Sequence, residues 1–270
     1  MIRVAACQVR LDIDAPDRAW ADALAAVRAA AAGGARLVVL PELASSGYVF
    51  ASRAEAQAAA TPAHGGVVGA LADLSGELDV VLVAGWAEAA PGGPYNSAVV
   101  LESGRVLGVY RKVHLWGDEP GCFTPGGDPP LVVDTRLGRV AVMICYDLEF
   151  PEWVRLARQR GADVVVAPVN WPLLDRPADQ PPLELLRAQA TAGAYRIPIV
   201  VADRAGRERG VDWIGGSCVV GRDGYLLAAP TLDGERPGIV TADVEPAGDT
   251  SIGPRNDVLG DRRPDLYVEG

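Results

Sequence analysis

The stretch "GARLVVLPE" at residues 34–42 returns in altered form as "GADVVVAPV" at residues 161–169. Both stretches begin with Gly-Ala, continue through a run of valine and other small apolar residues, and reach a proline near the end. A short apolar run of this kind, bounded by turn residues, is typical of a strand buried on both faces. We therefore interpret the two stretches as matching buried strands.

Two further pairs of segments match in the same order along the chain. "RVA" occurs at 3–5 and at 139–141, and "SAVVLESGRVL" at 97–107 resembles "SCVVGRDGYLL" at 217–227. Apolar strands resemble one another by chance, so any one pair is weak, but an ordered set indicates duplication. The sequence therefore predicts a repeated sheet-and-helix half, with two similar layers packed face to face.

Helical and strand patterns alternate along the chain. Pro16 is suited to a first helical turn, and apolar residues recur at helical spacing after it until Gly33-Gly34. Helices are also predicted around 63–77, 151–160 and 182–194. Short apolar runs between Gly, Pro and Asp turn signals predict the strands, so we expect an α/β protein with helices covering extended sheets.

Length and composition fit one large α/β domain or two small ones, and we expect a single domain over residues 1–270. The chain has 49% hydrophobic residues and a formal net charge of −10, without basic clusters, which argues against nucleic acid and anionic membranes as partners. No run of eighteen apolar residues occurs, and the N-terminus becomes charged too early for a signal peptide. We therefore expect an untargeted, soluble, cytoplasmic protein. Its tail, residues 246–270, is polar and rich in Pro and Gly, and we expect an extended arm there rather than a disordered terminus.

The cysteines do not have the spacing of a metal site. Cys7, Cys122, Cys145 and Cys218 are scattered, and the only two histidines, His64 and His114, form no ligand motif with them. A disulfide framework is not expected in so large a core. Each cysteine is therefore interpreted as a small buried hydrophobe or as a nucleophile.

Three reactive residues each follow an apolar run. Glu42 ends "LVVLPE", Lys112 ends "VLGVYRK", and Cys145 ends "VAVMICYD". Lys112 is also the only lysine in the chain. Sites in α/β folds form at strand ends, and a carboxylate, an ammonium and a thiol together provide a base, an oxyanion stabiliser and a nucleophile for acyl transfer. The alternatives are a strand-end ion pair, a surface cation and a core cysteine.

The segments around these residues resemble a known family. "LPE", "YRKVHLWGDEPGCFTPG" and "VMICYDLEFPE" are similar, in order and approximate separation, to the signature blocks of the nitrilase superfamily, the carbon-nitrogen hydrolases. The resemblance covers residues 1 to about 245. It implies a four-layer αββα sandwich, homodimers or larger homo-oligomers to which the tail arm would contribute, and a Glu-Lys-Cys triad that needs no cofactor and no metal.

The resemblance also implies a role for each residue of the motifs. Glu42 would be the general base, Lys112 the oxyanion stabiliser and Cys145 the nucleophile that forms a thioacyl-enzyme. Glu119, in the loop after the lysine, would assist them. The backbone N–H of Tyr146 would complete the oxyanion hole. His114 is so close to Lys112 that it invites a catalytic role, but the triad already has its base, so we expect a structural hydrogen bond.

The residues after the cysteine indicate the substrate class. Nitrilases proper usually have Cys-Trp-Glu there, whereas this chain has Cys-Tyr-Asp, which is similar to amidase-like branches. Branches that take anionic substrates commonly place arginine at or beside the position of Glu149. A second carboxylate would repel an anionic substrate, so we expect a small neutral or cationic carboxamide, unless Glu149 turns away toward Arg155. The candidate pocket residues are Tyr146, Glu149, Trp116, Asn170 and Trp171.

Other functions stay open from the sequence. The nearest alternatives are nitrilase and N-carbamoyl amidohydrolase activity. Remoter ones are acyl transfer to a nucleophile other than water, supply of ammonia to a synthetase, and a binding subunit without catalysis. A small-molecule amide is the expected partner.

Overall fold

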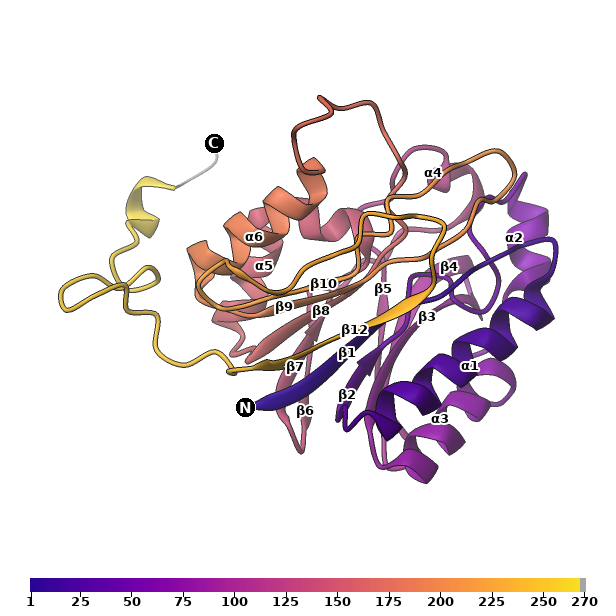
Figure 1. Ribbon diagram of the computed structural model, residues 1–270, viewed down its shortest axis with the longest axis horizontal. Coiled ribbons are helices and arrows are strands. Elements are labelled where there is room, and N and C mark those ends of the chain that lie inside the picture. Colours follow the sequence, from indigo (N-terminus) through magenta and orange to yellow (C-terminus); the bar gives the residue numbers. More distant parts are fainter. Residues whose placement is uncertain (268–270) are drawn as a thin grey trace.

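Two six-stranded sheets lie face to face in the computed structural model, which describes residues 1–267. The first sheet has the order β12-β1-β2-β3-β4-β5, and the second has the order β11-β10-β9-β8-β7-β6 (Figure 1). The strands of the first sheet are β1 (Ile2–Gln8), β2 (Leu37–Val39), β3 (Val81–Ala90), β4 (Gly93–Glu102), β5 (Arg105–Arg111) and β12 (Gly238–Val244). Those of the second are β6 (Leu131–Thr135), β7 (Gly138–Val142), β8 (Val164–Pro168), β9 (Ile199–Ala202), β10 (Cys218–Val220) and β11 (Leu226–Ala228).

The two sheets repeat one pairing pattern. In the first sheet β1, β2 and β3 are parallel neighbours, while β12, β4 and β5 pair antiparallel. In the second sheet β7, β8 and β9 are parallel neighbours, while β6, β10 and β11 pair antiparallel. The matched segments of the sequence fall on equivalent strands: β1 with β7, β2 with β8, and the hairpin β4–β5 with β10–β11. The predicted duplication is confirmed.

Helices cover the outer faces of both sheets. Helices α1 (Pro16–Ala32) and α3 (Gly66–Leu78) lie on the first sheet, and α5 (Pro151–Gln159) and α6 (Leu183–Tyr195) lie on the second (Figure 1). The predicted αββα sandwich is therefore confirmed, and so are the four predicted helices. Short elements lie in the connections: α2 (Arg53–Ala59), α4 (Glu119–Cys122) and the 3₁₀ helix η1 (Cys145–Glu149). A second 3₁₀ helix, η2 (Pro264–Leu266), lies in the tail.

Small and β-branched residues fill the space between the sheets. Val4, Val39 and Val83 of the first sheet share one fully buried cluster with Val142 and Val166 of the second. Side chains of similar, modest volume allow the inner faces of the two sheets to pack closely against each other. A second cluster joins α1 and α3 to the outer face of the first sheet. Together the two clusters fix the positions of the two sheets and of helices α1 and α3 relative to one another.

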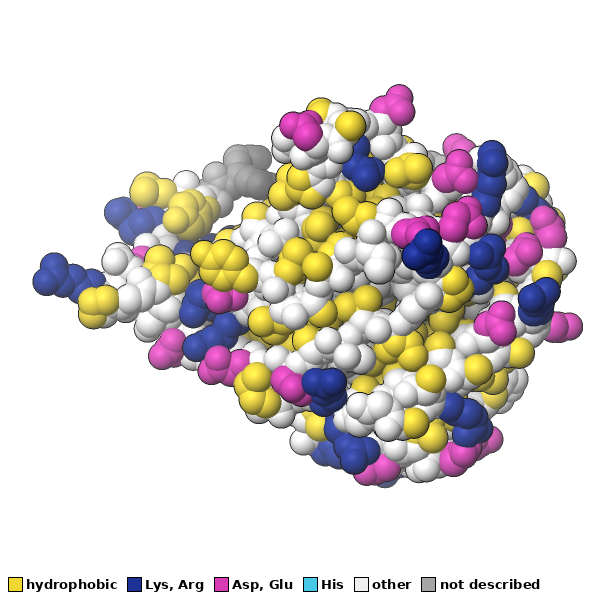
Figure 2. Space-filling model, viewed as in Figure 1, with side chains coloured by type: hydrophobic (Ala, Val, Ile, Leu, Met, Phe, Trp, Pro, Cys, Tyr) yellow, Lys and Arg dark blue, Asp and Glu magenta, His cyan; other side chains and the backbone are white. Residues whose placement is uncertain are grey.

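Charged side chains of both signs are interspersed on the face shown in Figure 2. The chain leaves this body after β12, and the yellow tail in Figure 1 extends away from the sheets. Its first residues stay attached, because the Ala247 N–H donates to the Asp163 carbonyl over 2.7 Å. Farther along, Ile252, Leu266 and Tyr267 are more than half exposed. None of the helices in residues 1–267 is long and apolar enough to cross a membrane.

Candidate active site

Glu42 lies three residues beyond β2, in a tight turn pressed against β3. Leu43 has a φ of +51°, and Gly85 of β3 lies directly under the turn. A Cβ at Gly85 would come within 2.6 Å of Glu42 Cα. Glycine at this position therefore allows the turn to pack directly on the sheet. In that position the Glu42 carboxylate is completely buried.

Lys112 follows β5 directly and joins two buried carboxylates. Its Nζ donates to Glu42 Oε1 over 2.8 Å and to Glu119 Oε1 over 2.7 Å. Asn96 Nδ2 also donates to Glu42 Oε1, over 2.7 Å. The side chain of Lys112 has no exposed surface. Burial acts to lower the pKa of Lys112, but the charges of Glu119 and Glu42 outweigh it and raise that pKa above the ordinary value.

The neighbouring cation Arg111 points to the opposite face of the strand, as strand alternation requires. There it forms a two-pronged pair with Glu88, over 2.8 Å and 2.7 Å. The adjacent cations Arg111 and Lys112 therefore lie in different environments, on opposite sides of the strand.

One oxygen of Glu42 is free to react. Oε1 accepts from Lys112 and Asn96, whereas the buried Oε2 accepts no hydrogen bond from residues 1–267. Burial raises the pKa of Glu42, Lys112 opposes that rise, and the charge of Glu119 adds to it. A carboxylate with a raised pKa and an unoccupied lone pair suits proton transfer near neutral pH.

Cys145 begins η1 in a left-handed backbone conformation, with a φ of +48°. Such a φ is uncommon outside glycine and marks a side chain held in a set direction. Its Sγ lies 3.7 Å from the Asn170 carbonyl oxygen. Burial raises the pKa of Cys145 well above its ordinary value, the charge of Glu42 adds to the rise, and Lys112 opposes it. The thiol therefore needs a neighbouring base to become a nucleophile.

Asn170 connects the groups that come from the two sheets. Its carbonyl accepts from Cys145, and its Nδ2 donates to the backbone carbonyl of Glu42 over 3.0 Å. Glu119 is fixed in a similar way, since its Oε2 accepts from the Trp116 N–H over 2.9 Å. The structure thus brings together Glu42, Lys112, Glu119 and Cys145.

All five predicted pocket residues line one small cavity beside Cys145. Trp116, Tyr146, Glu149, Asn170 and Trp171 share its wall with Tyr48, Pro172 and Glu184. Glu149 forms an ion pair with Arg187 of α6, and not with Arg155, which was the alternative considered from the sequence. That pair compensates the charge of Glu149, and Glu184 adds a second carboxylate to the same wall.

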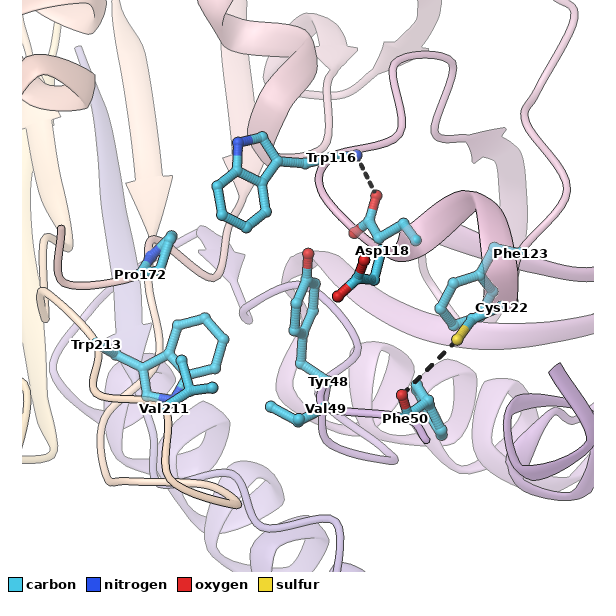
Figure 3. A pocket seen from close by; sticks show the side chains of 11 residues that line it. Tyr48, Val49, Phe50, Trp116, Asp118, Cys122, Phe123, Pro172, Val211 and Trp213 are labelled. Atoms are coloured by element: carbon cyan, nitrogen blue, oxygen red, sulfur yellow. Dashed lines mark hydrogen bonds between the residues drawn. The ribbon is translucent and has the colours of Figure 1, made fainter. Parts of the chain in front are cut away.

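A larger apolar hollow of about 170 Å³ adjoins this cavity (Figure 3). Tyr48, Trp116 and Pro172 belong to both walls, and Trp213 packs edge-on against the Tyr48 ring at a centroid distance of 5.4 Å. Burial, and then the charge of Glu119, raise the pKa of Tyr48, so its hydroxyl stays protonated. Tyr48 was not predicted from the sequence, because one aromatic in a loop resembles any core aromatic.

A buried carboxylate holds the loop that carries Tyr48. Glu208 Oε2 accepts from the Tyr48 and Val49 N–H groups, each over 2.8 Å, and its charge is paired with the fully buried Arg204 over 3.0 Å. Glu208 is 160 residues beyond Tyr48 in the chain, and only the fold brings the two together.

Comparisons with known proteins agree with this geometry. The family model described as "Carbon-nitrogen hydrolase" matches residues 3–251. A protein named "Nitrilase" from Pyrococcus abyssi is 35% identical over 268 residues, which cover 99% of each chain. An N-carbamoylputrescine amidase from Solanum lycopersicum is 31% identical over 89% of this chain and 85% of its own. A solved structure of an amidase from Nesterenkonia sp. AN1, a cysteine-to-alanine mutant in complex with butyramide, superposes with a TM-score of 0.79. It is 29% identical and covers 98% of this chain and 95% of that one.

Proposed function

Because the chain belongs to the carbon-nitrogen hydrolase family, we propose that it hydrolyses a small neutral or cationic carboxamide to the acid and ammonia. The observation that carries this proposal is the buried group of Glu42, Lys112 and Glu119 beside the thiol of Cys145. A base with a free oxygen, a compact cation and a nucleophile are what acyl transfer from an amide requires.

The reaction proceeds in two halves. Glu42 Oε2 takes the proton of the Cys145 thiol while Sγ attacks the carbonyl carbon of the amide. Lys112 Nζ and the backbone N–H of Tyr146 stabilise the oxyanion, and Glu42 then gives the proton to the departing nitrogen. Ammonia leaves a thioacyl-enzyme, which water attacks with Glu42 again as the base, releasing the carboxylic acid and restoring the thiol.

Glu119 acts on Lys112 and not on the substrate. Its Oε1 lies 2.7 Å from Nζ, and its Oε2 is held by the Trp116 N–H. This arrangement aims the ammonium and keeps it charged inside a buried pocket. The proposed role of Glu119 is therefore to orient the oxyanion stabiliser.

The wall of the pocket supports a neutral or cationic substrate. Arg187 neutralises Glu149, and Glu184 keeps the local balance negative, so an anionic substrate would be repelled. The adjoining hollow, lined by Phe50, Phe123 and Trp213, would accept an apolar acyl group larger than the small cavity itself holds.

A panel of amide, nitrile and N-carbamoyl compounds, assayed for ammonia release, tests this proposal. We expect the highest kcat/KM on a neutral or cationic amide, and we expect Cys145→Ala to abolish the activity. Full activity in that variant would sink the mechanism. A preference for a nitrile or an N-carbamoyl compound would contradict the amide proposal and favour nitrilase or N-carbamoyl amidohydrolase activity instead. Relatives named as a nitrilase and as an N-carbamoylputrescine amidase make these the two alternatives to test.

We also propose that the protein is a homodimer or a larger homo-oligomer with the tail as a contact. The tail exposes the apolar side chains of Ile252, Leu266 and Tyr267 away from the body, where a second copy of the chain would bury them.

A further inference from the structure

Asp147 is a fully buried carboxylate two residues after Cys145 that takes no part in the proposed chemistry. Its Oδ2 accepts from the Tyr110 hydroxyl over 2.8 Å and from the Ile144 N–H over 3.1 Å. Its Oδ1 accepts from the His114 N–H over 2.9 Å and lies 2.6 Å from His114 Nδ1. Four donors therefore surround one carboxylate.

The donors come from both sides of Lys112. Tyr110 precedes Lys112 by two residues, and His114 follows it by two. The carboxylate belongs to the turn that begins at Cys145. The side chain of Asp147 therefore ties residues 110–114, which contain Lys112, to the turn that carries Cys145, and we call this set of hydrogen bonds the Asp147 tie. The expected structural hydrogen bond of His114 is part of this tie.

Aromatic packing stiffens the same tie. The His114 ring stacks on Phe150 at a centroid distance of 4.0 Å, and Trp153 Nε1 donates to the Tyr110 hydroxyl over 3.0 Å. Burial, and then the charge of Asp147, raise the pKa of Tyr110, so its hydroxyl remains a donor. Phe150 lies between η1 and α5, and Trp153 lies in α5, so the helix after the nucleophile is anchored as well.

The turn needs such an anchor. Cys145 has a φ of +48°, and a residue other than glycine keeps that conformation only when its surroundings impose it. Asp147 does so from within the turn, since its Oδ2 binds the Ile144 N–H while its own N–H donates to the Ile144 carbonyl over 3.0 Å.

We propose that Asp147 is a positioning residue, which holds Cys145 and Lys112 at the separation that the reaction needs through the bonds from Tyr110, His114 and Ile144. This inference rests on the proposed function for the roles of Cys145 and Lys112. Asp147 does not contact the reacting atoms. Its effect is on the placement of two groups that come from different sheets.

The test compares Asp147→Asn with a matched control at Glu88, a buried carboxylate in β3. Glu88→Gln also removes a buried carboxylate, which pairs with Arg111 next to Lys112, but it lies outside the tie. We expect Asp147→Asn to lower kcat at least about 50-fold with KM changed less than about threefold, because misplacement penalises the transition state and not ground-state binding. Glu88→Gln should keep kcat within about twofold of the wild type.

A second measurement does not depend on the substrate. The rate of alkylation of Cys145 by iodoacetamide, with Cys145→Ala as background, should fall about tenfold in Asp147→Asn and not change in Glu88→Gln. If the wild type releases no ammonia from any amide, the proposed function fails, while this rate still tests the positioning.

Tyr110→Phe and His114→Gln keep the test possible if Asp147→Asn does not fold. Each removes one donor and should show a smaller loss of the same kind. Circular dichroism and thermal unfolding check that the variants are folded. A folded Asp147→Asn with kcat and alkylation rate close to the wild type, or losses equal to those of Glu88→Gln, would overturn the proposal.

Discussion

At the scale of single residues, the only lysine of the chain lies in a fully buried pocket that leaves room for a small cation. Lys112 Nζ has two carboxylate neighbours within 2.8 Å and no contact with solvent. A guanidinium is planar and larger, and it spreads its charge over three nitrogens. The pocket therefore accepts a compact ammonium and excludes the cation that the chain uses at its other 24 basic positions.

We expect Lys112→Arg to fold but to lose about 100- to 1,000-fold in kcat, the range observed when one oxyanion donor is removed. Steady-state kinetics together with circular dichroism measure both parts of this expectation. Arg111→Lys is the matched control, since that side chain is partly exposed and contacts Glu88 and the Tyr95 ring rather than the Lys112 pocket, and it should retain activity. Normal activity in Lys112→Arg would show that the single lysine is incidental.

At the scale of elements, the fit between β3 and the turn after β2 places Glu42, the proposed base. Gly85 lies in the middle of β3, and the nearest atoms to a Cβ there are backbone atoms of Glu42, Leu43 and Pro41, none of which moves freely. Glycine weakens a strand in general, so its presence here reflects the close approach of another backbone.

We expect Gly85→Ala to lower the free energy of unfolding by about 1–3 kcal/mol through overpacking, and to lower kcat by displacing Glu42. Gly69→Ala in α3 is the control, because nothing lies within 4 Å of its Cβ position. That change should stabilise the protein by about 0.5–1 kcal/mol through helix propensity. Urea unfolding and kinetics compare the two variants, and a Gly85→Ala protein equal to the wild type in both would contradict the packing argument.

The sequence predicted most of the helices and strands, but it missed several short ones. Periodic apolar patterns identified the four covering helices and the matched strands, because burial of one face imposes that pattern. Helices α2 and α4 and strand β6 were not predicted, whereas the three-residue strands β2 and β10 were, because those two lie within longer apolar runs. Motifs indicated the candidate reactive residues, but the partners of these residues depend on tertiary packing. The Glu149–Arg187 pair and the bonds from Tyr110 and His114 to Asp147 join residues 33 to 38 positions apart, which no local pattern reveals.

At the scale of the whole molecule, the tail is the segment with few hydrogen bonds to the body. Beyond Gly248, which accepts from Arg158, the bonds of residues 249–267 are made mainly within the tail itself.

We expect a chain shortened to residues 1–248 to keep its secondary structure but to form smaller assemblies than the full chain, because the exposed apolar side chains of the tail are lost with it. Sedimentation equilibrium at several protein concentrations measures the assembly state, and far-ultraviolet circular dichroism verifies the fold. An unchanged assembly state, or a full chain that sediments as a monomer, would contradict the proposed role of the tail.

The two halves share one strand order, yet they do not share one chemistry. Glu42 and Lys112 follow strands of the first sheet, Cys145 follows a strand of the second, and the counterpart of Glu42 in the repeat is Val169. Neither half alone contains a working set of groups. The activity therefore depends on the relative position of the two sheets. A shift of one sheet against the other by less than the width of a side chain would abolish the activity while the strands and helices stayed intact. Loss of activity is therefore expected to be an earlier sign of damage to this protein than loss of structure.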